Sequence, residues 1–368
     1  MIRSFRFPAI DRVVHGAGSV ARVSHLVDEL QGERVMIVTG RTLATGTPLI
    51  EALESALGPR HADTFARMGA HAPRADIEAA IEVARAAGAD VLVGYGGSSV
   101  TDATKIVALR LLDAGQPVVQ IHVPTTLSSG EWTPAAGMTG DVPGVKTYVA
   151  DPRMAPFAIV LDPEVTLMTP PELWLSTGIK IVDHACEMLW GPRSHPFTDT
   201  LAEEALRRIR RSLPVTRADP AAIDARLDCQ LAGWMSMAGI VNVRVHLSHT
   251  LGHQIAARWD VGHGITSCIT LPPVLSFMAS EHPDGVRRVA DAFDLNSEGD
   301  IAVVAAEAAG VIAGFIGALG LPTRLRDVGA RREDFPAVAD ATVAAGQATG
   351  YVPSGGAETL VELLETMW

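Results

Sequence analysis

Four continuous apolar runs in the first half of the chain most narrowly limit its fold. They are "RVMIVTG" (residues 34–40), "ADVLVGYGG" (89–97), "PVVQIHVPTT" (117–126) and "FAIVLDP" (157–163), and each ends in glycine, proline or threonine. Such runs are typical of strands that are buried on both faces of a parallel sheet. Between them, "DIEAAIEVARAAGA" (76–89) has the i, i+3, i+4 apolar spacing of a covering helix. The pattern predicts a doubly wound α/β domain.

The character of the sequence changes near Asp162–Pro163. Strand-like runs nearly vanish, and Ala/Leu-rich helical stretches follow at 198–212, 221–240, 300–319, 336–346 and 356–367. A chain of 368 residues also favours two domains over one core. We therefore expect an α/β N-terminal dinucleotide-binding domain with a parallel, doubly wound sheet over residues 1–162. An all-α C-terminal domain should follow over residues 163–368.

Charge and composition exclude several classes of partner. The formal net charge of −12 disfavours nucleic acid or an anionic membrane as a partner. The N-terminus has no signal-peptide core, and no stretch reaches the roughly 20 uninterrupted apolar residues of a membrane span. Cys186, Cys229 and Cys268 have no metal-ribbon or CxxC spacing, which favours reduced, packed thiols. We expect a cytoplasmic protein that acts on a small molecule.

Two loops that follow predicted strands have the chemistry of a nucleotide site. In "GYGGSSVTDATK" (94–105), glycines let the backbone approach a pyrophosphate, and the following helix supplies N–H donors. In "VPTTLSSGEWTP" (123–134), hydroxyl groups gather at the same end of the sheet. Either loop alone also fits an ordinary turn. Together they favour a nucleotide crevice at the carboxyl ends of the strands, whose predicted residues are Gly96, Gly97, Ser98, Ser99, Asp102, Thr125, Thr126 and Ser129.

Histidines concentrate in "HLSHTLGHQIAARWDVGHG" (246–264). His246, His249 and His253 follow i, i+3, i+7 spacing, which predicts one face of a helix, and His263 lies beyond it in a glycine-flanked turn. A single histidine is usually a packed core residue, but three on one stripe with a fourth nearby indicate a functional cluster.

These motifs together resemble the iron-containing (group III) alcohol dehydrogenase family, and the chain is also similar to its maleylacetate reductase branch. The family's GGGSxxDxxK loop matches residues 96–105, with Ser98 in place of the third glycine. Its PTTxxxGSExTP-like segment matches Pro124–Pro134, with the Gly–Ser order reversed. The resemblance implies an NAD(P)H-dependent oxidoreductase with a cleft between its two domains, and it assigns Lys146 to the neighbourhood of the nicotinamide ribose.

The resemblance also implies a metal site, and this chain departs from it. Metal-dependent family members hold Fe²⁺ or Zn²⁺ with one Asp and three His. The histidines correspond to His184, His249 and His263, but the Asp position holds Lys180. An ammonium about 4 Å from a divalent ion repels it by roughly 8 kcal/mol at an effective dielectric of 20. We therefore predict that no metal is bound, although a neutral or carbamylated lysine would permit one, in which case His184, His249 and His263 are the ligands.

Lys180 and the histidines His184, His249, His253 and His263 are the predicted catalytic residues. The Lys180 ammonium would polarise the substrate carbonyl as hydride arrives and an alkoxide develops. His253 would deliver the proton, with His246 as the alternative and Tyr148 as a more distant one. The "DVGHGIT" segment around His263 is more similar to the metal-dependent branch, so the substrate stays open.

The cofactor preference depends on the end of the "RVMIVTG" run. NAD-preferring relatives often have an acid at the position of Gly40, whereas here Arg41 follows and tolerates a 2′-phosphate. We expect NADPH to be preferred and NADH to be used also.

The leading hypothesis is a reductase that acts on a carbonyl of a small oxo acid or aldehyde, maleylacetate-like compounds included. The alternatives are a metal-dependent alcohol dehydrogenase of the same family, a lyase or cyclase similar to dehydroquinate synthase, and a non-catalytic nucleotide-binding relative. We also expect a homodimer, with "IRSFRFP" as a strand that pairs across its interface.

Overall fold

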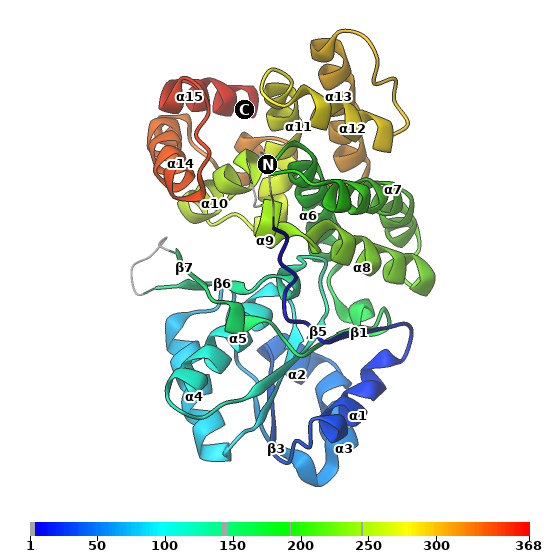
Figure 1. Ribbon diagram of the computed structural model, residues 1–368, viewed down its shortest axis with the longest axis vertical. Helices are drawn as coiled ribbons and strands as arrows, with labels where there is room; N and C mark the ends of the chain where they lie inside the picture. Colours follow the sequence, from blue (N-terminus) through cyan, green and yellow to red (C-terminus); the bar gives the residue numbers. More distant parts are fainter. Residues whose placement is uncertain (1–3, 141–145, 192, 244–245) are drawn as a thin grey trace. The chain divides into compact units, whose positions relative to one another are not determined.

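The computed structural model describes residues 4–140, 146–191, 193–243 and 246–368. Its contacts divide the chain into two compact units. The sheet unit comprises residues 7–170 and 221–230, and the helical unit comprises residues 1–6, 171–220 and 231–368. Each unit is described by itself below (Figure 1).

The sheet unit is built on six parallel strands in the order β1-β8-β5-β4-β2-β3. Their bounds are β1 Arg12–His15, β2 Val35–Val38, β3 His61–Phe65, β4 Val91–Gly96, β5 Val119–Pro124 and β8 Ala158–Leu161. The four predicted strands are all present. The sequence did not indicate β1 and β3, which form the two edges of the sheet, because their residues, RVVH and HADTF, include charged and polar side chains. A separate antiparallel pair, β6 Ala135–Thr139 and β7 Lys146–Ala150, was also not predicted.

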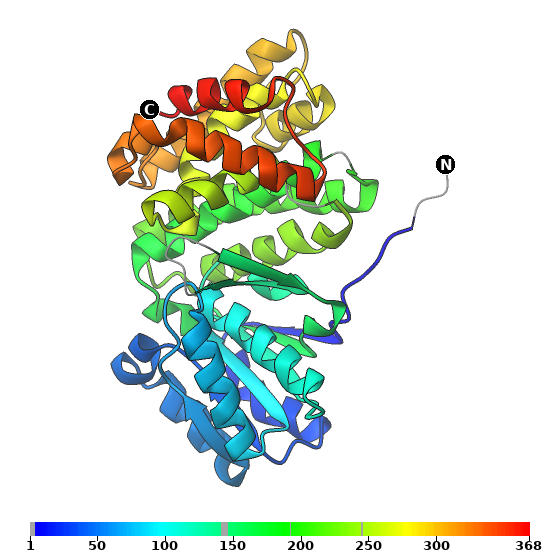
Figure 2. The ribbon, with the colours of Figure 1, turned by 90° about the vertical axis from the view of Figure 1, so that its left-hand side faces the viewer.

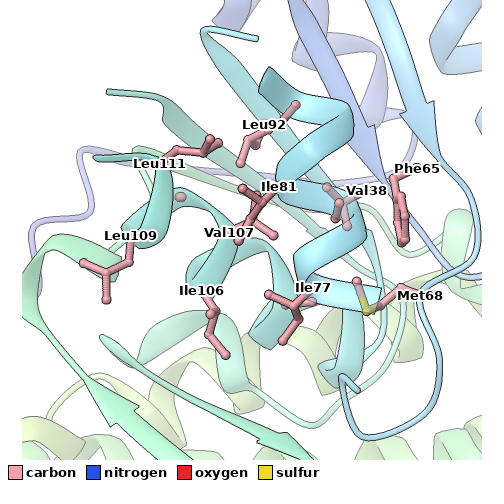
Figure 3. Close-up of a cluster of buried hydrophobic side chains, with 14 of the residues drawn as sticks. Val38, Phe65, Met68, Ile77, Ile81, Leu92, Ile106, Val107, Leu109 and Leu111 are labelled. Atoms are coloured by element: carbon pink, nitrogen blue, oxygen red, sulfur yellow. The ribbon is translucent and has the colours of Figure 1, made fainter. Parts of the chain in front are cut away.

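Helices cover both faces of this sheet, as the doubly wound prediction requires. On one face, α1 Arg22–Glu29 and α3 Leu49–Leu57 pack on strand residues such as Val35 and Ile37. On the other, α4 Arg74–Ala87 and α5 Ser98–Asp113 pack on residues such as Met36 and Val38, with Ile77, Ile81 and Ile106 at their centre (Figure 3). Successive β2 side chains point to opposite faces, so a continuous apolar run is needed to fill both cores.

The turn after β1 resembles a phosphate-binding loop in sequence but already has an internal partner. Gly16 and Gly18 of "HGAGS" have positive φ angles of 123° and 73°. Asp162, directly after the neighbouring strand β8, accepts hydrogen bonds from the main-chain N–H groups of Gly18 (3.2 Å) and Val20 (2.8 Å). The Asp162 carboxylate therefore already pairs the N–H groups that a phosphate would need. The hydrogen bonds of this turn stabilise the fold.

The helical unit contains the predicted C-terminal helices. Its helices are α6 Pro171–Trp190, α7 Pro196–Ala218, α9 Ile240–Val243, α10 Leu247–Trp259, α11 His263–Met278, α12 Pro283–Ala292, α13 Ile301–Ala318, α14 Phe335–Thr349 and α15 Gly356–Thr366. Helix α8, Ile223–Met237, contributes its first part to the sheet unit and the rest to the helical unit. Helix α6 is central, since every residue from Trp174 to Trp190 is buried. Figure 2 shows α14 and α15, in orange and red, lying side by side.

One helix among the described residues, α13, is long and apolar enough to cross a membrane by length and composition alone. A helix of a soluble protein can pass the same test. Here α13 buries Val304, Ala308, Ile312 and Ile316 within the helical unit, and Glu307 interrupts its apolar run.

The described part of the N-terminal segment packs against helices of its own chain. The main chain of Arg6 exchanges two hydrogen bonds with the Asn242 side chain, at 2.7 Å and 2.8 Å. The Phe5 ring contacts His195 and Phe197, with centroid distances of 5.2 Å and 5.4 Å. The homodimer and its N-terminal strand stay predictions.

Candidate active site

The first predicted cofactor loop joins β4 to α5. Gly97 is the N-cap residue of α5, and a Cβ atom there would lie 3.0 Å from the Thr126 side chain. Ser98 begins the helix and is exposed. The Ser99 hydroxyl oxygen accepts a hydrogen bond from the main-chain N–H of His71 at 2.8 Å. Glycine at 97 thus lets the two loops approach, and the α5 N-terminus is left open to an anion.

The second loop lies next to the first because β4 and β5 are neighbours, with Gly96 in register with Pro124. The main-chain N–H of Thr125 donates to the Gly96 carbonyl at 3.0 Å. The Thr126 and Ser128 hydroxyl groups are 3.0 Å apart, and Ser129 has a φ angle of 60°. The two loops therefore form one surface at the carboxyl end of the sheet, and their role in binding the cofactor stays a prediction.

The Lys105 side chain holds the segment 130–135, which follows Ser129 of the second loop, through hydrogen bonds. Its side chain is fully buried, and Nζ donates to the carbonyl oxygens of Gly130 (2.7 Å), Thr133 (3.1 Å) and Ala135 (2.6 Å). Burial lowers the pKa of Lys105, and the Asp102 carboxylate, 3.7 Å away, opposes that shift. A solvated lysine is thus ruled out at this position. The ammonium fixes the segment that follows Ser129.

The other residues predicted to bind the cofactor lie on α5, on α2 (Arg41–Gly46) and on β7. Asp102 accepts a hydrogen bond from the main-chain N–H of Gly137 at 3.2 Å, so it also braces the β6–β7 pair. Arg41 is exposed at the first position of α2. Lys146 begins β7, but its side chain lies outside the described residues. Tyr148 is half-exposed on the same strand, and a Cβ at Gly137 would lie 3.1 Å from its ring.

In the helical unit, α6 presents a row of four buried polar side chains. Lys180, Asp183, His184 and Glu187 follow i, i+3, i+4, i+7 spacing and therefore share one face. Each is at most 3% exposed. The Lys180 ammonium lies 3.4 Å from Nδ1 of His249 on α10. Asp183 accepts a hydrogen bond from Ser267 on α11 at 2.6 Å. One helix face thus bonds to two neighbouring helices.

Four of the predicted histidines converge beside this face. The ring centroids of His184 and His249 are 5.4 Å apart, and those of His249 and His263 are 5.3 Å apart. His253 lies 4.4 Å from both His249 and His263. The ring nitrogens of His249, His253 and His263 fall within 4.8 Å of one another, so these three could hold a metal ion. His184 is not part of that group.

Gly264 allows α11 to begin against α6. A Cβ atom at Gly264 would lie 2.7 Å from the Ser176 carbonyl oxygen, closer than packing permits. Because His263 is the preceding residue, this close approach brings its ring to the cluster. The glycine in "GHG" is therefore a packing requirement of the site.

Glu187 fixes the start of α10, a role that the sequence analysis missed. Its two carboxylate oxygens accept the main-chain N–H groups of His246 (2.9 Å) and His249 (3.0 Å). A carboxylate at a helix N-terminus pairs otherwise unsatisfied donors. Glu187 follows His184 by three residues, and this spacing was the available signal.

Burial shifts the pKa values of the ionisable groups in the site. Burial, and then the Lys180 charge, holds the pKa of both His184 and His249 well below the usual range. Burial raises the pKa of Asp183, which Lys180 opposes, and burial and Asp183 raise the pKa of Glu187 to about 8. Both histidines are therefore neutral near pH 7. A protonated Lys180 can only donate, in which case Nδ1 of His249 is the acceptor and the ring proton lies on Nε2.

His246 does not lie on the stripe that its spacing predicted. It is the N-cap residue of α10, with φ −120° and ψ −148°, so its side chain leaves the helical face. Its ring packs instead on Tyr351, with a centroid distance of 3.8 Å, and on His282, at 5.4 Å.

The comparisons with known proteins fit this arrangement. The profile of the iron-containing alcohol dehydrogenases matches residues 11–163, and that of the C-terminal part of the Fe-containing alcohol dehydrogenase family matches residues 174–368. The chain belongs to the iron-containing alcohol dehydrogenase family. The resemblance seen in the motifs is thereby confirmed, and the protein is an NAD(P)-dependent oxidoreductase of this family.

Within the iron-containing alcohol dehydrogenase family, the chain is similar to several maleylacetate reductases. The enzyme of Sphingobium indicum is 33% identical over 283 residues, which are 76% of this chain and 77% of the relative. The enzyme of Burkholderia cepacia is 30% identical over 93% of this chain and 92% of the relative. The crystal structure of maleylacetate reductase from Rhizobium sp. strain MTP-10005 superposes with a TM-score of 0.86 at 28% identity, covering 100% of this chain and 99% of that one.

Proposed function

We propose that the protein is a cytoplasmic NAD(P)H-dependent reductase of a carbonyl in a small oxo acid, with aldehydes as the wider substrate class, and that it works without a metal. The buried Lys180 beside His249 carries this proposal. The resemblance places a metal-ligating Asp at position 180, and here an ammonium stands there. The similarity to maleylacetate reductases supports an oxo acid, such as maleylacetate, as the substrate.

The hydrogen bond between Lys180 and His249 argues against the family's metal ion. A histidine that ligates a metal through one ring nitrogen carries its proton on the other, which usually donates to a carboxylate or carbonyl. If His249 ligated through Nε2, its Nδ1 proton would point at the Lys180 ammonium 3.4 Å away. If it ligated through Nδ1, the ion would lie next to that ammonium. With Lys180 protonated, His249 does not fit as a ligand of a divalent metal in either case.

Under this proposal, each unit would supply a distinct part of the reaction. The loops around Gly97 and Thr126 would hold the cofactor, with the α5 N-terminus facing its diphosphate. Bound NAD(P)H supplies the hydride. In the helical unit, the Lys180 ammonium would stabilise the negative charge that develops on the carbonyl oxygen.

His253 is the residue that we propose delivers the proton to that oxygen. Its ring lies 4.4 Å from both His249 and His263, so it is held within the cluster by neighbours on two helices. Proton delivery by a positioned histidine is typically worth 10²–10⁴ in rate. Exposed Arg41 would accept a 2′-phosphate and favour NADPH.

Elemental analysis of wild type and Lys180→Asp tests this proposal. The wild-type chain should contain less than stoichiometric iron or zinc and keep its oxo-acid reductase activity after treatment with a chelator. Lys180→Ala should lower kcat by roughly 10²–10³-fold, the scale for one oxyanion-stabilising group. Lys180→Asp should acquire affinity for Zn²⁺ because it restores an anionic ligand. One tightly bound metal ion per wild-type chain would overturn the metal-free proposal.

The second candidate is a metal-dependent alcohol dehydrogenase of the same family. The proximity of His249, His253 and His263 favours it, since three neutral imidazoles are a known catalytic zinc set. The same elemental analysis decides between the two. A lyase or cyclase similar to dehydroquinate synthase would release phosphate without net NAD(P)H consumption, which absorbance at 340 nm distinguishes.

A further inference from the structure

His246 is a buried side chain without a hydrogen-bond partner. It is 2% exposed, and neither Nδ1 nor Nε2 of its ring is bonded to any group in the described part of the chain. A buried polar atom left unsatisfied costs about 1–3 kcal/mol. The main-chain N–H of the same residue, by contrast, is held by Glu187 at 2.9 Å. The backbone is therefore fixed, while the ring has unused hydrogen-bonding capacity.

The ring is covered by aromatic neighbours that do not hydrogen-bond to it. Tyr351 lies against it at a centroid distance of 3.8 Å and an interplanar angle of 37°, and His282 meets it edge-on at 5.4 Å. The Tyr351 hydroxyl donates instead to the Glu281 carboxylate, and the Ser354 hydroxyl lies 3.4 Å from the other oxygen of Glu281. The hydrogen bond to Glu281 thus holds the Tyr351 ring against His246.

Two helices begin at this point, which favours negative charge. His246 is the N-cap residue of the 13-residue helix α10, and His282 is the N-cap residue of the 10-residue helix α12. The N-terminus of a helix carries a partial positive charge. At α10, Glu187 already accepts the N–H groups of His246 and His249, so the remaining attraction for an anion comes from the His246 ring and the start of α12.

The segment that carries Tyr351 joins α14 to α15 and has glycine at both ends. Gly350 has a φ angle of 92°, and Gly355 and Gly356 have φ angles of 85° and 61°. Glycine tolerates these and many other backbone conformations at little cost. The Tyr351 ring can therefore move away from His246 once its bond to Glu281 is exchanged.

We propose that His246 binds a carboxylate group of the substrate, so that the enzyme selects oxo acids over neutral carbonyl compounds, and that Tyr351 covers His246 in the free protein. A neutral imidazole always carries one N–H, and a carboxylate oxygen is its acceptor. Glu187 accepts the main-chain N–H groups of both His246 and His249, so the His246 backbone lies beside the face of α6 that carries Lys180. A carboxylate held by His246 would therefore lie on the side of this cluster at which α10 begins.

This inference rests on the proposed function for its choice of substrate, so its first test does not use turnover. An unreactive dicarboxylate, glutarate, is titrated calorimetrically into the NADPH-saturated protein. Wild type should bind glutarate, and His246→Phe should bind it ten- to hundredfold more weakly, the effect of one hydrogen bond to a charged group. His246→Gln keeps an N–H donor and should recover part of the affinity. Equal affinity of wild type and His246→Phe, or no binding by either, overturns the inference.

Stability measurements separate recognition from a merely structural role. His246→Phe keeps a ring against Tyr351 and removes two unsatisfied nitrogens, so its Tm should not fall below that of wild type. With maleylacetate as substrate, the variant should raise KM and leave kcat within a few-fold. Tyr351→Ala should lower Tm without raising KM. If Tyr351→Ala raises KM as much as His246→Phe does, the cluster is a packing element and the inference fails. Absence of any oxo-acid reduction by wild type would refute the proposed function alone, because glutarate binding is judged separately.

Discussion

Replacement of Lys105 by methionine should destabilise the protein and weaken cofactor binding together. The Lys105 ammonium is fully buried and donates to three carbonyl oxygens of the segment 130–135. Three hydrogen bonds from a charged donor are worth about 1.5–3 kcal/mol each, or about 4.5–9 kcal/mol in sum. Removal of the buried charge returns a desolvation cost of several kcal/mol. We expect a net loss of about 2–5 kcal/mol in the free energy of unfolding.

Urea denaturation measures this loss, and fluorescence titration with NADPH measures its consequence for the site. The segment that Lys105 holds directly follows Ser129, so the dissociation constant for NADPH should rise several-fold or more. Arg110→Met is the matched control, because Arg110 lies on the same helix but is exposed. If Lys105→Met stays within about 1 kcal/mol of wild type, or loses stability with unchanged NADPH affinity, the anchoring role is wrong.

Gly97→Val should weaken NADPH binding by well over tenfold, because a Cβ atom at position 97 lies 3.0 Å from the Thr126 side chain. Gly46→Ala is the control and should leave NADPH binding unchanged, since a Cβ atom at position 46 has no atom within 4 Å. Fluorescence titration of both variants with NADPH checks this prediction. Glu187→Ala leaves two buried N–H groups unpaired, so urea denaturation should show a loss of about 2–6 kcal/mol; a loss under 1 kcal/mol contradicts the capping role. The Arg258 guanidinium lowers the pKa of Asp334 to about 2, so Asp334 contributes stability above pH 4 that is lost as the pH falls through 2. Asp334→Asn should therefore be less stable than wild type at pH 7, and the difference should shrink as the pH falls through 2, as thermal unfolding across this range can show.

The sequence predicted best those features that depend on local periodicity. The buried runs ending at Val38, Gly96 and Leu161 are strands, and the spacing of Lys180 and His184 does place them on one face of α6. The edge strands β1 and β3 were missed because a partly polar strand gives no continuous apolar run. Only the fold, through their hydrogen-bonded neighbours, identifies them.

What the sequence could not supply were the contacts between distant segments. The bonds of Glu187 to residues 59 and 62 positions later have no signature beyond a favourable spacing. The departure of His246 from the histidine stripe depends on where α10 begins, and helix ends are the least certain part of a prediction from sequence. Tyr351, about 100 residues beyond His246, had no feature that connected it to the site.

The burial of Lys105 and Lys180 has a consequence for protein chemistry. The chain contains only three lysines, Lys105, Lys146 and Lys180, and its other cations are arginines. Lys105 is 0% exposed and Lys180 is 3% exposed. Amine-directed reagents such as succinimidyl esters therefore find neither of these two side chains at the surface. Labelling at Lys180, followed by peptide mass spectrometry with and without substrate, would report on access to the proposed reaction centre.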